Sequence, residues 1–163
     1  MKNNTLQKQD LLSTAGNEIV TWGENFATGI EVIDNQHKEL VNLTNALYQA
    51  CLNPVTELES VFKDAMSRMV EYVHSHFSTE IQLLERIKYP DVQNHKKQHE
   101  QLVQKILGAV SDHGTGKKFV PNHFVRTLRD WIFGHIAVFD QAFGIYIKEQ
   151  KSKGLLTDKD IIG

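Results

Sequence analysis

Apolar residues recur every three or four positions along most of the chain, and this spacing predicts helices. We expect four of them, over residues 34–52, 57–88, 92–110 and 121–151. Asp34 suits the N-cap of the first helix, and Pro121 suits the first turn of the fourth. Breaks are expected at Pro54, at Pro90 and in a glycine-bearing loop over residues 111–120. Four amphipathic helices with short connections predict an all-α fold, an antiparallel up-down four-helix bundle.

The two ends of the chain have a different pattern. Residues 1–18 are polar, and we expect them to form a flexible N-terminal extension. The next stretch, up to Ile33, mixes aromatic and β-branched residues with glycines, which favours an extended N-terminal arm packed on the bundle. The bundle domain is then expected to span residues 19–152. Gly154 should stop the last helix, and residues 153–163 should form a short C-terminal tail.

Composition narrows the classes of function. The 163 residues fit one domain, and a net charge of −2 argues against a nucleic-acid partner, because phosphate binding needs a basic face. No run of 18 apolar residues could span a membrane, and the N-terminus has no apolar segment typical of a secretory signal. Cys51 is the only cysteine, which excludes an intrachain disulfide. We therefore expect a cytoplasmic protein without membrane association.

Histidines and acids fall at helical spacing on the apolar faces. The pairs His76–Glu80 and His95–His99 are each four residues apart, so each pair shares one face of its helix. A carboxylate on an apolar stripe, such as Glu80, must be paired or bind a metal. A single histidine in such a place is more often an ordinary core residue. Seven residues drawn from all four helices instead favour a metal site: His37, His76, Glu80, His95, His99, His135 and Asp140.

Two points qualify this ligand set. His135 and Asp140 are five residues apart, which on a regular α-helix turns them about 140° away from each other. Asp140 can join the site if the helix widens locally as a π-bulge, and otherwise it is a surface residue. His74, His113 and His123 are interpreted as surface histidines.

The ligand types also indicate which metals the site suits. Imidazole with carboxylate suits iron, zinc or manganese better than calcium or magnesium.

At these residues the chain resembles the hemerythrin family, in particular bacterial hemerythrin-like domains. The matching segments are Gly29-Ile30, Ile33 to Lys38, His76-Phe77 with Glu80, Tyr89-Pro90 with His95 and His99, and Trp131 with His135-Ile136 and Asp140. The resemblance covers about residues 19–151 and implies a non-heme centre of two iron ions with a bridging oxo or hydroxo group. It implies one iron at His95, His99 and His135, another at His37 and His76, and bridges by Glu80 and Asp140. It also implies an oxygen pocket formed by Phe77, Trp131, Ile132 and Ile136.

The resemblance implies reversible O2 binding at the two-histidine iron, for oxygen storage, delivery or scavenging, and no enzymatic activity. The alternative is an oxygen or redox sensory module coupled to a signalling partner, although the chain is little longer than the domain and we expect no output module. An oxidase-type di-iron enzyme should carry more carboxylates than two, which argues against a peroxidase or a protein that processes NO. A metal-free helical interaction domain should have lost at least one ligand, and none is lost.

Overall fold

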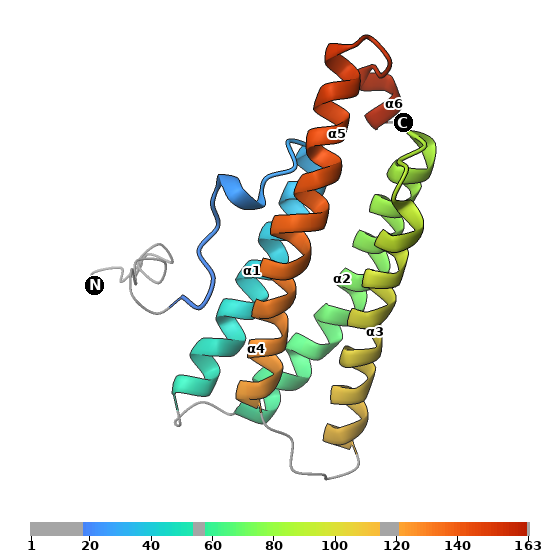
Figure 1. Ribbon diagram of the computed structural model, residues 1–163. Helices are drawn as coiled ribbons and strands as arrows, with labels where there is room; N and C mark the ends of the chain where they lie inside the picture. Colours follow the sequence, from blue (N-terminus) through green and yellow to red (C-terminus); the bar gives the residue numbers. More distant parts are fainter. Residues whose placement is uncertain (1–17, 54–57, 115–120, 163) are drawn as a thin grey trace, which may run out of the picture.

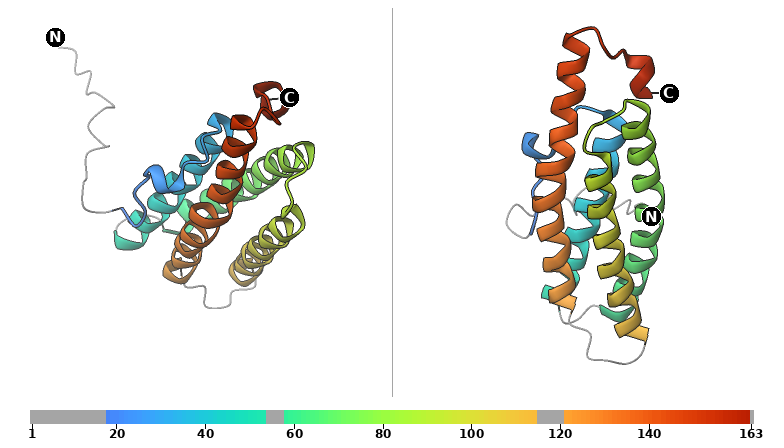
Figure 2. Two further views of the ribbon diagram at one scale, coloured as in Figure 1. Left: turned by 45° about the horizontal axis from the view of Figure 1, so that its top comes forward. Right: turned by 45° about the vertical axis from the view of Figure 1, so that its right-hand side comes forward.

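The computed structural model describes residues 18–53, 58–114 and 121–162, and regular structure in that part of the chain is helical. The elements in chain order are η1 (Glu24–Phe26), α1 (Glu31–Leu52), α2 (Leu58–Arg86), α3 (Val92–Gly114), α4 (Pro121–Trp131), η2 (Ile132–Asp140), α5 (Gln141–Ser152) and α6 (Asp158–Ile162). Helices α1 and α3 run downward in Figure 1, whereas α2 and the continuous rod of α4, η2 and α5 run upward. The further views in Figure 2 show the same packing, so the predicted all-α antiparallel bundle is confirmed.

The first long helix begins three residues earlier than predicted, and the prediction of Asp34 as its N-cap is wrong. Gly29 has a φ of 81°, a left-handed conformation that glycine adopts without strain, and it turns the chain directly into the helix at Glu31. The Asp34 carboxylate instead accepts hydrogen bonds from Thr28, by the backbone N–H at 2.7 Å and by Oγ1 at 2.8 Å. It also accepts one from the Gly29 N–H at 3.1 Å. Asp34 therefore fastens the arm to the first turn of α1.

The N-terminal arm lies along the bundle, as predicted (Figure 1). The Asn45 side chain of α1 accepts hydrogen bonds from the backbone N–H groups of Ile19 and Val20 at 3.1 Å each. Its amide nitrogen donates to the Val20 carbonyl at 2.8 Å. Further along, Gly144 of α5 approaches the arm so closely that a Cβ built there would lie 2.5 Å from the carbonyl oxygen of Thr28. The arm is thus held at both of its ends.

The third helix is longer than predicted. It continues to Gly114, because residues 111–113 contain neither glycine nor proline. The first part of the loop predicted over residues 111–120 is therefore helical, while residues 115–120 lie outside the described residues. The predicted break at Pro54 and the predicted flexible extension, apart from its last residue Glu18, lie outside them as well.

The C-terminal tail forms a short helix that folds back on the bundle. Gly154 ends α5 as predicted, with a φ of 70° and with the next N–H, that of Leu155, bonded to the Gln150 carbonyl at 2.9 Å. The chain then forms α6, which the polar composition of the tail does not predict. Its Ile161, with Leu156 before the helix, packs against an apolar cluster at the upper end of the bundle, and this contact gives the short helix its stability.

The rod that closes the bundle contains a π-helical stretch of nine residues, η2. At its end the backbone N–H of Gln141 bonds to the carbonyl of Ile136, five residues back. Because this spacing sets residues five apart nearly above one another, His135 and Asp140 point to the same side. The local widening that the spacing of these two residues requires is therefore present.

The core consists of two apolar clusters at different heights of the bundle. The upper cluster includes Ile33, Leu84 and Phe143, and the lower one includes Leu40 and Leu102 among its fully buried residues. Burial of such side chains contributes about 1.5–3 kcal/mol each to stability. The candidate metal ligands fall between these clusters along every long helix, so the fold surrounds them with apolar side chains above and below.

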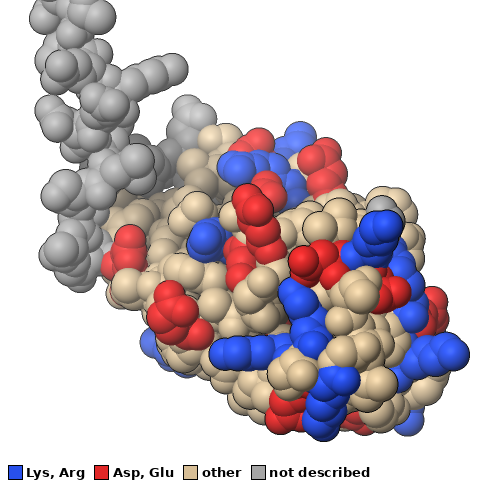
Figure 3. All heavy atoms as spheres, turned by 90° about the horizontal axis from the view of Figure 1, so that it is seen from above, with Lys and Arg blue, Asp and Glu red and all other residues tan. Residues whose placement is uncertain are grey.

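The end of the bundle that carries α6 is densely charged. Figure 3, which looks down on this end, shows lysine and arginine interspersed with aspartate and glutamate, so this face offers no continuous basic surface. Lys151 and Asp158 form an ion pair there between α5 and α6. Within the described residues, none of the helices combines the length and the apolar character needed to cross a bilayer.

Candidate metal centre

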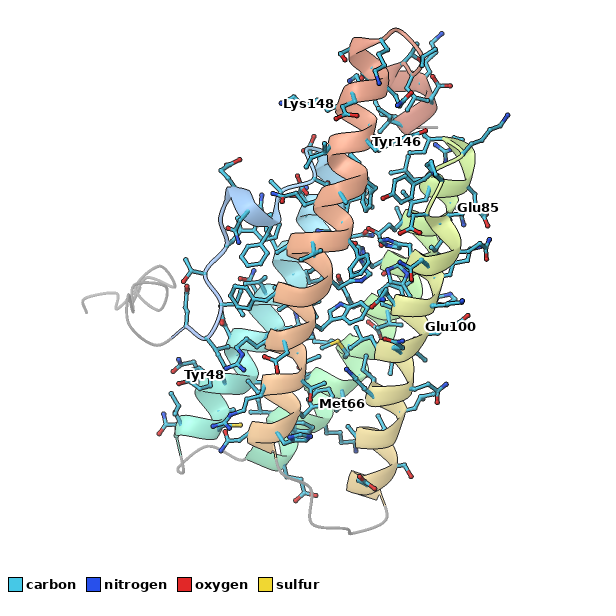
Figure 4. The ribbon with its side chains drawn as sticks, in the orientation of Figure 1. Tyr48, Met66, Glu85, Glu100, Tyr146 and Lys148 are labelled. Carbon is cyan, nitrogen blue, oxygen red and sulfur yellow. The ribbon has the colours of Figure 1, made fainter. Side chains whose placement is uncertain are left out.

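The seven candidate ligands meet in the interior of the bundle. Each of them is 4% exposed or less. Helix α1 contributes His37, α2 contributes His76 and Glu80, α3 contributes His95 and His99, and η2 contributes His135 and Asp140. Figure 4 shows the corresponding gathering of nitrogen and oxygen atoms at mid-height, between the helices.

The ligand atoms form two groups that share one carboxylate. In the first group the donor atoms of Glu80, His95, His99 and His135 lie within 4.8 Å of one another. In the second group those of His37, His76, Glu80 and Asp140 do the same. Either group has the size and composition to hold a metal ion. The protein thus supplies three histidines to one position and two to the other.

The two carboxylates stand between these groups. Glu80 Oε2 lies 2.9 Å from the Nε2 atom of His99 and 3.7 Å from that of His76, so a single oxygen faces both groups. The two oxygens of Asp140 diverge, with Oδ1 3.0 Å from His135 Nε2 and Oδ2 3.1 Å from His37 Nε2. This is the arrangement expected of bridging ligands.

The environment favours the metal-binding protonation states of most of these groups. Burial lowers the pKa of His76 to about 4 and also lowers the pKa of His99, so both imidazoles are neutral at pH 7. Burial opposes ionisation of Glu80 and Asp140, but the surrounding histidines hold the pKa of each carboxyl below its usual value. Burial also lowers the pKa of His95, but the hydrogen bond and the charge of Glu80 outweigh it and leave that pKa raised. Neutral imidazole and ionised carboxylate are the forms that bind metals.

The hydrogen bonding of the cluster is incomplete without a metal ion. Among the described residues, eight buried side-chain nitrogen and oxygen atoms have no hydrogen-bond partner, and seven of them belong to this cluster. They include both oxygens of Asp140, Oε1 of Glu80 and Nε2 of His37. Leaving such atoms unpaired in a dry interior is costly, and a metal ion satisfies carboxylate oxygens and Nε2 nitrogens directly. Five imidazoles with two carboxylates suit iron, zinc or manganese, so these residues fit a two-metal centre.

Aromatic rings hold the imidazoles in place. The Phe77 ring lies parallel to the His99 ring, with centroids 3.6 Å apart and an interplanar angle of 4°. Trp131 stacks on His135 in the same way, at 4.0 Å and 16°. These contacts restrict ring rotation and exclude water on the side of the three-histidine group.

Two of the four residues expected to form the oxygen pocket contact histidines of the cluster, and the other two are buried in the apolar core. Phe77 and Trp131 contact histidines of the three-histidine group, as described above, and Phe77 also lies 5.6 Å from His76, between ring centroids. Ile132 and Ile136 are buried, at 0% and 1% exposure, and both belong to the lower apolar cluster.

Analysis of the sequence missed two residues that contact the two-histidine group. Gln36 Oε1 lies 2.9 Å from Nδ1 of His76, so the proton of this imidazole sits on Nδ1 and Nε2 is free to bind a metal. The ring of Tyr72 stacks on the ring of His76, with centroids 4.9 Å apart and an interplanar angle of 19°. The available signals were weak: Gln36 directly precedes His37, and Tyr72 lies one helical turn before His76.

Two of the remaining histidines have exposed side chains. His74 and His123 are exposed, as expected for surface residues, and the side chain of His113 lies outside the described residues.

A helical bundle whose long helices all contribute inward histidines or carboxylates belongs to the class of metal-binding four-helix bundles. Comparison with known families defines it further, because the model of the hemerythrin HHE cation-binding domain matches residues 28–144. The chain belongs to the hemerythrin family.

Individual relatives agree with this assignment. The chain is 29% identical over 140 residues to a bacteriohemerythrin of Pseudomonas aeruginosa, covering 86% of this chain and 88% of the relative. It is 27% identical over 127 residues to a bacteriohemerythrin of Methylococcus capsulatus, covering 77% and 95%. Among solved structures, a wild-type hemerythrin superposes with a TM-score of 0.70 at 26% identity, covering 78% of this chain and 96% of that one.

Proposed function

We propose that the cluster holds two iron ions and that the protein binds O2 reversibly, for oxygen storage, delivery or scavenging. The observation that carries this proposal is the unequal sharing of histidines between two groups that meet at Glu80. The group with His37 and His76 receives fewer nitrogen ligands, and a metal with fewer protein ligands keeps a position for an outside molecule. When bound, a pair of ferrous ions supplies the electrons needed to hold O2.

The surroundings support binding of a small molecule rather than its conversion. Most residues of the lower apolar cluster beside the site, among them Leu40, Leu102, Ile132 and Ile136, cannot give or take a proton. Stacked aromatic rings cover the histidines of the three-histidine group and keep water away. Membership of a family with bacteriohemerythrin relatives supports the same proposal, and we propose no enzymatic activity.

The test is a metal count together with a visible spectrum. Protein loaded with ferrous iron under argon is exposed to O2 and then returned to argon, with His74→Ala as a control because His74 is an exposed histidine of the same helix as His76. We expect two irons per chain and a colour that forms with O2 and disappears on its removal. Iron that oxidises once and does not recover would favour a redox sensor or an enzyme. Zinc, or no metal, would contradict the proposal.

The alternative function is that of an oxygen or redox sensor for a signalling partner. One observation favours it: the Trp22 ring of the arm lies 6.4 Å from that of His37, so a change at the two-histidine group can reach the arm. A partner that binds the oxidised protein at least tenfold more tightly than the reduced protein would support this role. For either function we propose the cytoplasm as the compartment, in keeping with the single cysteine, Cys51.

A further inference from the structure

Tyr72 lies directly beside the two-histidine group. It is on α2, one turn before His76, and the two rings are nearly parallel with centroids 4.9 Å apart. Both side chains leave the same face of the same helix and run into the bundle. Because tyrosine is the longer of the two, its hydroxyl can extend past the His76 ring toward the centre of the bundle.

Among the described residues, this hydroxyl is the one buried side-chain polar atom outside the ligand set that has no hydrogen-bond partner. Of the eight buried side-chain nitrogen and oxygen atoms without a hydrogen-bond partner among the described residues, seven belong to the candidate ligands and the eighth is the Tyr72 hydroxyl oxygen. Tyr72 itself is 5% exposed and is part of the lower apolar cluster. An unpaired hydroxyl in such a place is unfavourable, whereas replacing it by an apolar group of the same shape costs little. A tyrosine at this position is thus explained if the hydrogen-bond partner of its hydroxyl is a bound molecule and not a group of the protein.

The chemistry of the phenol identifies the hydroxyl as a donor. A phenol is a weak acid that loses its proton only well above neutral pH. The phenol therefore keeps its proton at neutral pH and can donate it in a hydrogen bond. The complementary partner is a small molecule with a lone pair on oxygen or nitrogen.

We propose that Tyr72 is a ligand-binding residue of the oxygen site, whose hydroxyl donates a hydrogen bond to the small molecule held at the two-histidine group. This inference rests on the proposed function and adds a residue to it. The bond stabilises the bound molecule and slows its release. Phe77, Trp131, Ile132 and Ile136, the residues of the expected oxygen pocket, offer no hydroxyl for this purpose.

The test compares Tyr72→Phe with Tyr48→Phe. Tyr48 is a suitable control because it packs on the same lower apolar cluster but lies on α1, 11 residues beyond His37, toward the lower end of the bundle (Figure 4). The probes are O2, by its release rate from reduced iron-loaded protein, and azide, by its dissociation constant with the oxidised protein. Loss of one hydrogen bond to a charged ligand should accelerate O2 release and weaken azide binding about tenfold in Tyr72→Phe. Neither quantity should change in Tyr48→Phe.

A second measurement separates ligand binding from a structural role. The thermal midpoint of the iron-free protein should be unchanged or higher in Tyr72→Phe, because an orphaned hydroxyl is removed without loss of a bond. A lower midpoint together with unchanged O2 and azide constants would overturn the proposal, and so would loss of iron from this variant. If the wild type loads two irons and binds O2, unchanged constants in Tyr72→Phe overturn the role of Tyr72 alone. If the loaded wild type does not bind O2, the proposed function fails, and the azide comparison still decides whether Tyr72 donates to a ligand.

Discussion

The Nε2 atoms of His99 and His135 lie 3.1 Å apart and face each other between α3 and η2. Two neutral imidazole nitrogens at this distance present either a shared proton or two lone pairs, and a metal ion satisfies the lone pairs of both. His99 Nε2 also lies 2.9 Å from Glu80 Oε2 on α2. The single ring of His99 therefore connects three helices through the centre of the cluster.

His99→Ala should remove metal from the three-histidine group. The variant loses one of four donor atoms that converge there, so iron content should fall from two per chain to one or fewer after anaerobic loading. Elemental analysis of the desalted protein measures this. His74→Ala, an exposed position on α2, should retain the full content. Two tightly bound irons in His99→Ala would exclude this ligand assignment.

Gln36→Leu should weaken the second metal position without removing a ligand. The Gln36 carbonyl fixes the proton of His76 on Nδ1, and loss of such a partner typically reduces metal affinity 10- to 100-fold. Competition with a coloured chelator would measure the affinity of the more weakly held iron. Gln93→Leu, on an exposed position of α3, serves as the matched control. Equal affinities in all three proteins would show that Gln36 does not orient the ligand.

The iron-free protein should lose stability as the pH falls from 7 towards 4.5. In the unfolded chain His76 takes up a proton near its ordinary pKa of 6.5, whereas in the folded protein it does so only near 4. Between these values the unfolded state binds more protons, so lower pH favours unfolding, by up to about 3 kcal/mol for this residue. His95, whose pKa is raised, acts in the opposite direction. Urea unfolding at several pH values measures how steeply the free energy of unfolding depends on pH. This dependence should become shallower in His76→Phe. An unchanged dependence in that variant would contradict the assignment of the effect to His76.

Gly144→Ala should destabilise the packing of the arm on α5. The new methyl group would lie 2.5 Å from the Thr28 carbonyl oxygen, and the backbone there must shift, at a cost of about 1–3 kcal/mol. Gly108→Ala on α3 meets no atom within 4 Å and should instead stabilise its helix by up to about 1 kcal/mol. Denaturant unfolding of the iron-free proteins compares the two substitutions. Equal midpoints for the two variants would mean that the arm is not held at Gly144.

The parts of the structure that depend on local spacing could be predicted from the sequence. Helical periodicity and prolines defined the bundle, and i, i+4 pairs such as His95 and His99 indicated which faces carry ligands. The π-helical stretch was one of two outcomes that the spacing left open, because His135 and Asp140 share a face only if the helix widens, and Asp140 is otherwise a surface residue.

The parts of the structure that depend on contacts between distant segments could not be predicted from the sequence. Asp34 is consistent with an N-cap in the sequence, yet its carboxylate is used by the backbone of the arm. The tail forms α6 because Leu156 and Ile161 find apolar partners on the bundle, which no local pattern reveals. Gln36 becomes recognisable as a site residue only once α1 and α2 are packed together, since it contacts His76 of α2. Tyr72 shares a face of α2 with His76, but only the packed bundle shows that its hydroxyl is buried without a partner.

The widened turn in η2 also has a consequence for how this chain can change over evolutionary time. A π-helical stretch has more residues in each turn than an α-helix, so returning these same nine residues to regular α-helix would rotate everything beyond Asp140 about the helix axis. Phe143, Gly144 and Ile147 would then leave the positions in which they pack against the core and the arm. Substitutions can alter the metal ligands one at a time, but the wide winding of this segment cannot be lost without displacing α5. Its nine residues link the chemistry at the centre of the bundle to the integrity of its upper half.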